Sequence, residues 1–480
     1  MRWPFLAFLV VAVSHVSYAK DQMPTNPSDT YLSQNWSSYA AINRLKYAKV
    51  PSVTLKTPTL NGVDPGAQNG PFQPDGLAVA STRESEFSLI INGRLHIDYW
   101  GFLREDPAIA AVEGGDPRSR VGFRRIRVSA KGAVRRHIIY KIEIEFASPD
   151  NTEWRDAFIG FRRIPVIQKV IVGNQKRPYG LDHLNSSRYN VFLERPMFID
   201  AFNDDTRRLG TVIYGINRGK TMTWMVGGYS GDKVQDEAAF YKSEQFQGEV
   251  AGRFAHTAYY DRASDGRTYV HWAVSGTVAF PDGAGDDGVS NTAHFRARPE
   301  ARSDNRWVDT GSIAGATNYQ LLGVENVVNV KRFQFVSEAQ HTWVQREGKR
   351  DLRFWGAYAY LSLFLTDDYM SWNRKTGTLG RIKPARNLVL QGDEGAQNTG
   401  PGAWQIGVRY SVTDLSDHDI QGGVAHSLTA GLNWYFNAFS RLQVNYLRGQ
   451  LSRSAALNAV AGSSTKTTYD VLGARLMVDF

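Results

Sequence analysis

From Glu86 onward the chain consists of segments of about ten residues in which apolar and polar side chains alternate. In Ile138–Phe146 every second residue is apolar or aromatic, while Lys and Glu occupy most of the opposite positions. Trp404–Thr413 and Leu428–Phe436 repeat the pattern, and clusters of Gly, Asp, Asn and Ser separate the segments. Because neighbouring side chains of a β-strand point to opposite faces, this period of two predicts an all-β protein.

Such strands fit two kinds of protein. A soluble sandwich buries one face of each sheet, whereas a transmembrane barrel turns its apolar face to lipid and its polar face to water. The segments are long for a sandwich, and aromatic pairs lie toward their ends, at Tyr99–Trp100, Tyr259–Tyr260 and Trp434–Tyr435, where a bilayer interface favours them. The pattern therefore favours the barrel.

The last strand strengthens this interpretation. Phe480 is the final residue, and Val478, Leu476, Ala474 and Leu472 precede it at every second position. Outer-membrane barrels typically end on such an aromatic-terminated strand, which the assembly machinery recognises; a soluble edge strand that ends on Phe by chance is the alternative. At roughly 25 residues per strand and connection, this region predicts a transmembrane antiparallel up-and-down β-barrel of about 16 strands.

The region before the barrel divides into two parts. A cation precedes a short apolar run at residues 5–13, and small residues follow up to Ala19. Residues 1–19 are therefore predicted to be a signal peptide rather than a buried strand. Residues 20–85 are rich in Pro, Ser, Asn and Thr and are interpreted as a mostly irregular periplasmic extension. The outer-membrane β-barrel is then expected to occupy residues 86–480.

Composition narrows the chemistry. The chain has 480 residues, of which 42% are hydrophobic and 21% charged, a net charge of +9 and no Cys. A chain with this share of apolar residues is expected to fold rather than to be disordered. The absence of Cys excludes thiol chemistry. After the N-terminus no apolar run reaches the ~18 residues of a transmembrane helix. A basic exported protein is expected to meet anionic solutes, lipopolysaccharide or phosphate rather than nucleic acid.

Sequence motifs for catalysis or cofactor binding are either absent or lack the secondary structure that they require. The 10 His residues are dispersed, and the chain has no zinc-protease, P-loop or nucleophile-elbow pattern. Gly283–Gly288 fits a dinucleotide-binding pattern but opens no helix, so it is interpreted as a turn, with a calcium loop as the alternative. We therefore predict no enzyme, no cofactor and no metal site.

Several stretches resemble the phosphate-selective porin O and P family, in the order expected for it. They are Glu86–Tyr99, Phe123–Ile126, Gly173–Leu181, Asn185–Arg188, Leu193–Arg195, Arg296–Glu300, Ala359–Thr366, Gly380–Pro384, Gly402–Gln405 and Gly431–Tyr435. The resemblance covers the chain from about Val53 to Phe480. It implies a sixteen-stranded, trimeric outer-membrane channel whose narrow eyelet is lined by cations that conduct phosphate or other anions.

The family's eyelet arginines lie in Gly-Gly-Arg and Phe-Arg-Arg motifs, which correspond here to Arg94, Arg124 and Arg125. The alternation of side chains along the strand supports Arg94 independently of the resemblance. Most apolar side chains of Glu86–Tyr99 have odd numbers, so the even-numbered Arg94 falls on the lumen face. Arg124 and Arg125 are adjacent, and both can point inward only where the strand bends or bulges. Otherwise one of them is a rim cation that touches lipopolysaccharide.

The chain departs from the family at Gly180–His183, where Gly-Leu-Asp-His replaces Gly-Leu-Glu-Lys. His183 is then the fourth candidate for the anion-binding eyelet, although a neutral imidazole would weaken the field. The irregular stretch Asn174–Arg208 is too long for a tight turn and contains five arginines. We predict that it folds into the barrel as a constriction loop, with a surface loop as the alternative.

Four further arginines, Arg296, Arg298, Arg302 and Arg306, lie within eleven residues. The resemblance implies an extracellular anion funnel at the first two positions, and we expect all four to capture anions before the eyelet. Without the resemblance, four arginines so close together would be interpreted as a solvated loop. Lys56 corresponds to a lysine on the periplasmic side of the family's channel.

These observations predict a passive channel that prefers anions, with phosphate or polyphosphate as the leading solute. A general, weakly selective diffusion porin is the alternative, and a plugged anchor or a barrel-embedded hydrolase is more remote. The expected partners are small anions, outer-membrane lipid and lipopolysaccharide, the barrel-assembly machinery through Phe480, and further copies of the chain in a homotrimer.

Overall fold

The computed structural model describes residues 72–73, 76–81, 87–105, 107–135, 137–147, 152–164, 167–203, 206–231, 233–234, 247–282, 293–388, 399–459 and 466–480. The predicted signal peptide, Lys56 and the turn Gly283–Gly288 lie outside these residues, as does most of the predicted extension. The chain divides into two units, Met1–Ser52 and Val53–Phe480, and every described element belongs to the second.

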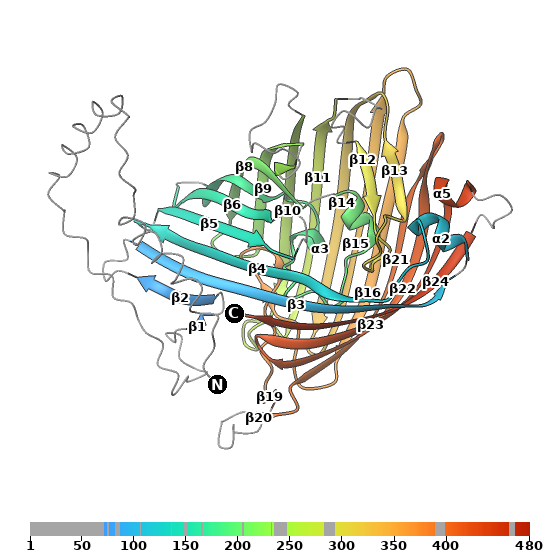
Figure 1. The fold of residues 1–480 in the computed structure, drawn as a ribbon. Helices are drawn as coiled ribbons and strands as arrows, with labels where there is room; N and C mark the ends of the chain where they lie inside the picture. The colour runs from blue at the N-terminus through green and yellow to red at the C-terminus, as the bar shows by residue number, and fades with distance from the viewer. Residues whose placement is uncertain are drawn as a thin grey trace, which may run out of the picture. The chain divides into compact units, whose positions relative to one another are not determined.

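Sixteen of the described strands close into one antiparallel barrel, which confirms the predicted fold class (Figure 1). They are β3 (Phe87–Glu105), β4 (Arg120–Val134), β5 (Ile138–Glu145), β6 (Glu153–Arg162), β7 (Lys169–Lys176), β8 (Arg207–Ile216), β9 (Met222–Ser230), β10 (Gly248–Tyr260), β11 (Thr268–Phe280), β14 (Ala316–Val330), β15 (Phe333–Arg346), β16 (Leu352–Phe364), β21 (Ala403–Asp417), β22 (Ile420–Asn437), β23 (Ser440–Ser454) and β24 (Lys466–Asp479). Each pairs with its neighbours in this order, and β24 pairs with β3 to close the barrel.

Burial along the strands is the reverse of that in a soluble protein. On β3 the polar side chains Asn92, Arg94, His96 and Asp98 are at most 7% exposed, whereas Leu95 is 37% exposed. The strands therefore turn polar side chains into the lumen and apolar side chains toward lipid, as a transmembrane barrel requires. The lumen position predicted for Arg94 from parity is confirmed.

Helices are few and short among the described residues. They are α2 (Pro107–Glu113), α3 (Leu181–Leu184), α4 (Met197–Ala201) and α5 (Ala455–Asn458). No helix in this part of the chain is long and apolar enough to cross a membrane.

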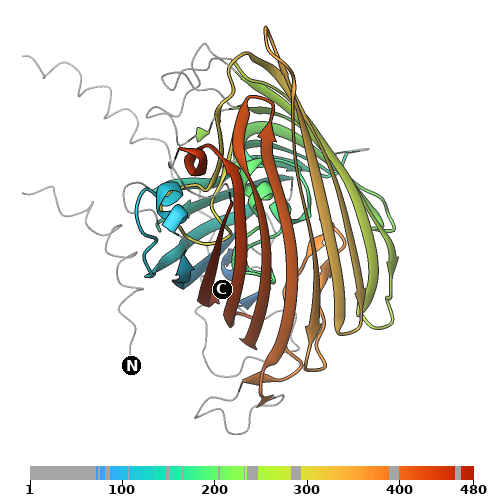
Figure 2. The same cartoon turned by 90° about the vertical axis from the view of Figure 1, so that its right-hand side faces the viewer.

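The two ends of the barrel carry different connections. We call the end that holds Phe480 the lower end; its turns are short apart from the connection between β16 and β21, which carries four two-residue strands. These are β17 (Trp372–Asn373), β18 (Thr378–Leu379), β19 (Asn387–Leu388) and β20 (Thr399–Gly400). The upper end carries the longer connections, including the β12–β13 hairpin (His294–Ala297 and Val308–Ser312). Figure 2 shows the long yellow and orange strands running between these two ends.

The connection between β7 and β8 crosses the lumen. We call its described part, residues 177–203, the constriction loop; it contains α3 and α4. The Asp182 amide donates to Glu338 Oε2 on β15 (3.0 Å), and Arg475 on β24 donates to the Leu193 carbonyl (2.7 Å). The predicted inward-folded loop is therefore confirmed, although the ends of the predicted stretch Asn174–Arg208 belong to the flanking strands.

The seam of the barrel lies where the last strand meets the first. Phe480 and Gly93 exchange two backbone hydrogen bonds, of 3.1 and 3.2 Å. A Cβ added to Gly93 would lie 2.6 Å from Phe480 Cζ, so the terminal ring rests directly on this glycine. Beyond Phe480, β2 (Gly76–Ser81) pairs with the remaining residues of β3, and β1 (Phe72–Gln73) pairs with β2.

Candidate functional site

A cavity of about 710 Å³, here called the upper cavity, lies between the wall from β3 to β8, the constriction loop and the β12–β13 hairpin. Among the described residues, fifteen cations and seven carboxylates line it. The cations are Arg94, Arg124, Arg125, Arg127, Lys141, Arg155, Lys176, Arg188, Arg195, Arg207, Lys233, Arg296, Arg298, Arg302 and Arg306. A concave, low-dielectric wall with this excess of positive charge concentrates anions.

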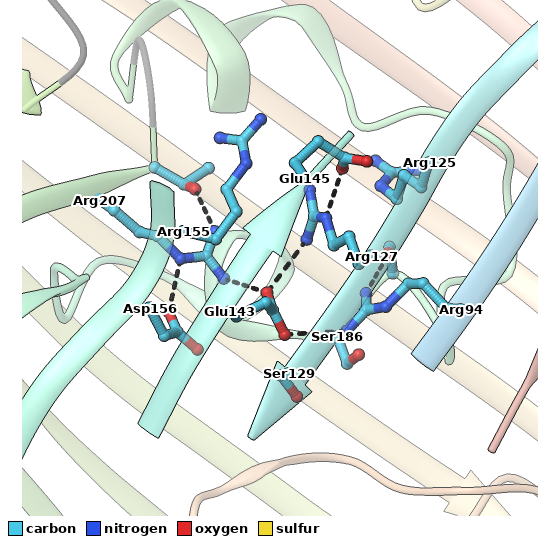
Figure 3. Close-up of polar contacts among 12 residues, drawn as sticks. Arg94, Arg125, Arg127, Ser129, Glu143, Glu145, Arg155, Asp156, Ser186 and Arg207 are labelled. Carbon is cyan, nitrogen blue, oxygen red and sulfur yellow. Dashed lines mark hydrogen bonds and ion pairs between the residues drawn. The ribbon is translucent and has the colours of Figure 1, made fainter. Parts of the chain in front are cut away.

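Arg94 reaches from β3 toward the constriction loop. Its Nη1 donates to Ser187 Oγ (2.7 Å), and its Nη2 lies 3.7 Å from the Glu143 carboxylate. Figure 3 shows Arg94, Arg127 and Arg207 converging on Glu143 from different strands. The guanidinium is thus held in a network rather than free in the lumen.

Arg124 and Arg125 both line the upper cavity. The register of β3 and β4 shifts by one residue between Arg125 and Phe123, which leaves Arg124 as the extra residue of a β-bulge. Arg124 forms a bidentate ion pair with Glu194 (2.7 and 2.9 Å), whereas the buried Arg125 has Nη1 3.4 Å from His96 Nδ1. The bulge considered in the sequence analysis is therefore present, and neither arginine is a rim cation.

His183 lies on α3 but does not line the upper cavity. Its side chain is fully buried and packs against Tyr179, with ring centroids 5.7 Å apart. Burial and the charge of Lys176 lower the pKa of His183, so the imidazole is neutral at pH 7. The structure does not bring His183 into the eyelet, because the short helix turns the ring away. Lys176 lines the cavity instead, and its Nζ donates to the carbonyls of His183, Leu184 and Asn185 (2.7 to 3.0 Å).

The four arginines of the predicted funnel line the same cavity as the eyelet arginines. Arg298 donates to the carbonyls of Ser303 (2.9 Å) and Asp304 (3.3 Å), which shapes the hairpin loop. Arg302 is exposed, and the charge of Arg124 together with partial burial lowers its pKa to about 10. Arg302 therefore stays protonated at pH 7 and adds a positive charge to the cavity wall.

Sequence reasoning missed the carboxylates of this cavity and several of its cations. Arg127, Lys141, Glu143 and Glu145 occupy the polar faces of β4 and β5, and Asp156 faces them from β6. Alternation places Lys141, Glu143 and Glu145 on one face of β5, since they are two residues apart along the strand. Nothing in the local sequence indicates that they meet one another.

A second cavity, here called the lower cavity, has a volume of about 850 Å³. Its wall includes Lys169 and Lys375, and Lys169 Nζ lies 4.1 Å from the centroid of the Tyr214 ring. Asp156, Lys176 and Leu184 line both cavities. The two cavities therefore adjoin at these three side chains, one of which is acidic and one basic.

Asp200 on α4 is a lumen carboxyl that titrates near neutral pH. It lines the upper cavity, where Arg195, Glu194, Arg124 and Asp182 act on its charge. Burial raises the pKa of Asp200 to about 6, against the attraction of Arg195. Below that pH the cavity loses one negative charge.

Comparison with known proteins decides the family. The family model described as "Phosphate-selective porin O and P" matches residues 90–480. The chain belongs to this family. An uncharacterised protein of Caulobacter vibrioides is 28% identical over 365 residues, covering 75% of this chain and 68% of its own. Porin O of Pseudomonas aeruginosa is 22% identical over 417 residues, covering 79% of this chain and 86% of its own.

Three solved structures of outer-membrane proteins are among those that match this structure. OmpT of Vibrio cholerae in its trimer form is 10% identical and covers 82% of this chain and 99% of its own, with a TM-score of 0.48. An anion-selective porin from Comamonas acidovorans is 13% identical, covers 82% of this chain and 100% of its own, and has a TM-score of 0.48. The channel DcaP of Acinetobacter baumannii is 10% identical and covers 83% of this chain and 99% of its own, with a TM-score of 0.48.

Family membership and the barrel together place the porin in the outer membrane as a channel. The lumen holds its polar and charged side chains, and the outer wall presents apolar ones to lipid. Among the described residues no cluster of His, Asp and Glu could hold a metal ion. The barrel and the family favour a channel over an enzyme.

Proposed function

We propose that this porin is a passive channel that prefers anions, with phosphate or polyphosphate as its leading solute. The observation that supports this best is the lining of the upper cavity, where fifteen cations stand against seven carboxylates. Arg94, Arg124 and Arg125 are the proposed eyelet residues, and Lys176 stands where the sequence analysis expected His183. Arginine suits this role because its planar fork matches two oxygens of a phosphate at once.

The physical reason lies in hydration. An anion that enters a narrow pore loses water, and fixed cations replace it; at ~4 Å and an effective dielectric of ~20 each contributes about 4 kcal/mol before desolvation. Permeation also requires release, so binding at any one point must stay moderate. A series of cations from Arg302 through Arg94 to Lys176 meets both needs, because it offers several sites rather than one tight site.

A general, weakly selective porin is the second candidate function. The carboxylates of the upper cavity favour it, because Arg124 is paired with Glu194 and Arg127 with Glu145 (2.5 Å). Ion pairs of this kind reduce the positive field that a solute meets. The anion selectivity of the channel then depends on the net positive charge that remains in the upper cavity after these ion pairs have formed.

One experiment separates the two candidates. The protein is inserted into planar bilayers, the reversal potential is measured across a potassium chloride gradient, and phosphate is then titrated against the chloride current. We expect an anion-selective reversal potential and a saturable block by phosphate. A potential near zero with no block would support the general porin.

The upper arginines are expected to act by long-range attraction. Changing Arg296, Arg298 and Arg302 to Gln should lower chloride conductance roughly two- to fivefold at low salt, since long-range attraction of anions falls with ionic strength. Gln retains donors for the carbonyls that Arg298 contacts. The single-channel conductance is compared at 50 mM and 1 M salt.

The control for this prediction is Arg262→Gln, which removes an exposed cation from a turn at the lower end. It should leave the low-salt conductance nearly unchanged. A loss of conductance in the triple variant that is undiminished at 1 M salt, where the screening length is ~3 Å, would refute a steering role.

Asp200 predicts a pH dependence of ion selectivity. Its pKa of about 6 lies above the usual value for Asp, so the carboxyl is charged at pH 7.5 and mostly neutral at pH 5. The chloride-to-potassium permeability ratio should therefore rise roughly two- to threefold as the pH falls over this range. In Asp200→Asn the ratio at pH 7.5 should already be high and should change less with pH.

The matched control for Asp200 is Asp304→Asn. Asp304 is exposed, and the hydrogen bond from Arg120 lowers its pKa, so it stays charged from pH 7.5 to pH 5. Its replacement should not alter the pH dependence. Equal pH responses in wild type and Asp200→Asn would show that another group titrates.

The expected partners stay predictions. A homotrimer would migrate as a high-mass band on electrophoresis without heating, and the OmpT structure from Vibrio cholerae is described as a trimer form. Binding of lipopolysaccharide and recognition by the assembly machinery are likewise expected for an outer-membrane barrel. The periplasmic extension and the role of Lys56 are proposals that rest on the sequence.

A further inference from the structure

Glu143 is the centre of the charge network in the upper cavity (Figure 3). It lies on β5, is 2% exposed, and faces cations from four strands. Its Oε2 lies 3.2 Å from Lys141 Nζ and 3.7 Å from Arg94 Nη2. Its Oε1 lies 3.3 Å from Arg207 Nη2 and 3.5 Å from Arg127 Nη1. One carboxylate thus stands where four cations converge.

The four cations are held in place by other partners. Each has a closer polar contact away from Glu143, and the pairs are Arg94 with Ser187 (2.7 Å), Arg127 with Glu145 (2.5 Å), Arg207 with Asp156 (2.5 Å), and Lys141 with Asp156. Charge-assisted hydrogen bonds are usually about 2.7 to 2.9 Å long. The contacts to Glu143 are longer, so each cation is positioned mainly by its other partner, and the cluster would keep its shape without Glu143.

We propose that Glu143 is a resident anion of the pore, which competes with permeating anions for the cluster of Arg94, Arg127, Lys141 and Arg207. This inference rests on the proposed anion channel and names a residue that sets its specificity. A carboxylate carries a single negative charge. At the same distance, a monovalent anion is attracted to the cluster about as strongly as the Glu143 carboxylate is. A divalent oxyanion gains about twice that Coulomb energy.

The consequence is discrimination by valence. With Glu143 in place, divalent anions such as sulfate or hydrogenphosphate bind at the cluster and monovalent anions pass it with little retention. The resident carboxylate also limits the depth of the site, which keeps release of a divalent anion fast. Because Glu143 repels a divalent anion about twice as strongly as a monovalent one, it weakens divalent binding more and so prevents divalent oxyanions from being trapped.

The test compares Glu143→Gln with Glu145→Gln in the full-length protein. Both changes remove one negative charge from β5 and keep the side-chain shape, but Glu145 is held tightly by Arg127 and by the Ile126 amide (2.7 Å). The block of chloride current is measured at pH 8 with sulfate as the divalent probe and nitrate as the monovalent probe. In Glu143→Gln the nitrate affinity should rise at least tenfold and the sulfate affinity should rise more, so that the sulfate-to-nitrate affinity ratio also rises. Glu145→Gln leaves Glu143 and its contacts in place and should change both quantities clearly less than Glu143→Gln does.

Glu143→Asp is the second variant, because loss of a carboxylate could destabilise the barrel. It keeps the charge but withdraws it from the cluster, so the nitrate affinity should rise partly, by about threefold. Barrel formation is checked by heat-modifiable migration on electrophoresis. Equal effects of Glu143→Gln and Glu145→Gln, or an unchanged affinity ratio in both Glu143 variants, would overturn the resident-anion proposal. Absence of any sulfate block in the wild type would instead overturn the proposed anion channel.

Discussion

Replacing Arg94 and Arg125 together with Ala is expected to abolish the saturable block of chloride current by phosphate. Both side chains are buried in the lumen and line the upper cavity, where a phosphate has little water to replace the lost contacts. Each charge-assisted contact contributes about 1.5 to 3 kcal/mol, so losing two should weaken phosphate binding far more than tenfold. The measurement is a phosphate titration of the single-channel chloride current in planar bilayers.

The control removes the same charge elsewhere. Arg262 and Arg353 are exposed and line neither cavity, so their double replacement by Ala should leave the phosphate block intact. Because the eyelet site is desolvated, the effect of the Arg94 and Arg125 changes should also persist at 1 M salt. Block at the wild-type level in the double variant would show that the eyelet lies elsewhere and would favour the general porin.

Deletion of Phe480 is expected to reduce the yield of assembled barrel in the outer membrane to a small fraction of the wild type. The residue closes the seam through two backbone hydrogen bonds to Gly93, and its ring covers that glycine. Export should be unaffected, since it depends on the predicted signal peptide. Fractionation followed by electrophoresis with and without heating distinguishes processed periplasmic protein from assembled barrel.

Two variants separate the ring from the hydrogen bonds. Phe480→Tyr keeps an aromatic ring and the backbone bonds and should assemble normally. Phe480→Ala keeps the backbone bonds to Gly93 but removes the ring that lies over this glycine, so it should impair assembly partly. Normal assembly after deletion of Phe480 would disprove its role in closing the barrel.

The sequence by itself determined which face of each strand meets lipid and which meets water. The lumen position of Arg94 and the barrel class were both predicted from alternation, and the structure has them. This was possible because alternation is a local property of extended backbone and does not depend on the partner strand. The length of the irregular stretch and its arginines favoured an inward path over a surface loop, and the structure has the inward path.

Only the tertiary structure decided where the charges meet. Arg207 and Glu143 are 64 residues apart in the chain, yet β8 and β5 bring them within 3.3 Å in one lumen. The inward turn of Arg124 depends on a shift of register against β3, and α3 rather than the residue type removes His183 from the cavity wall. Strand register and the path of a loop arise from contacts between segments that are distant in the chain, so the spacing of residues within one segment does not predict them.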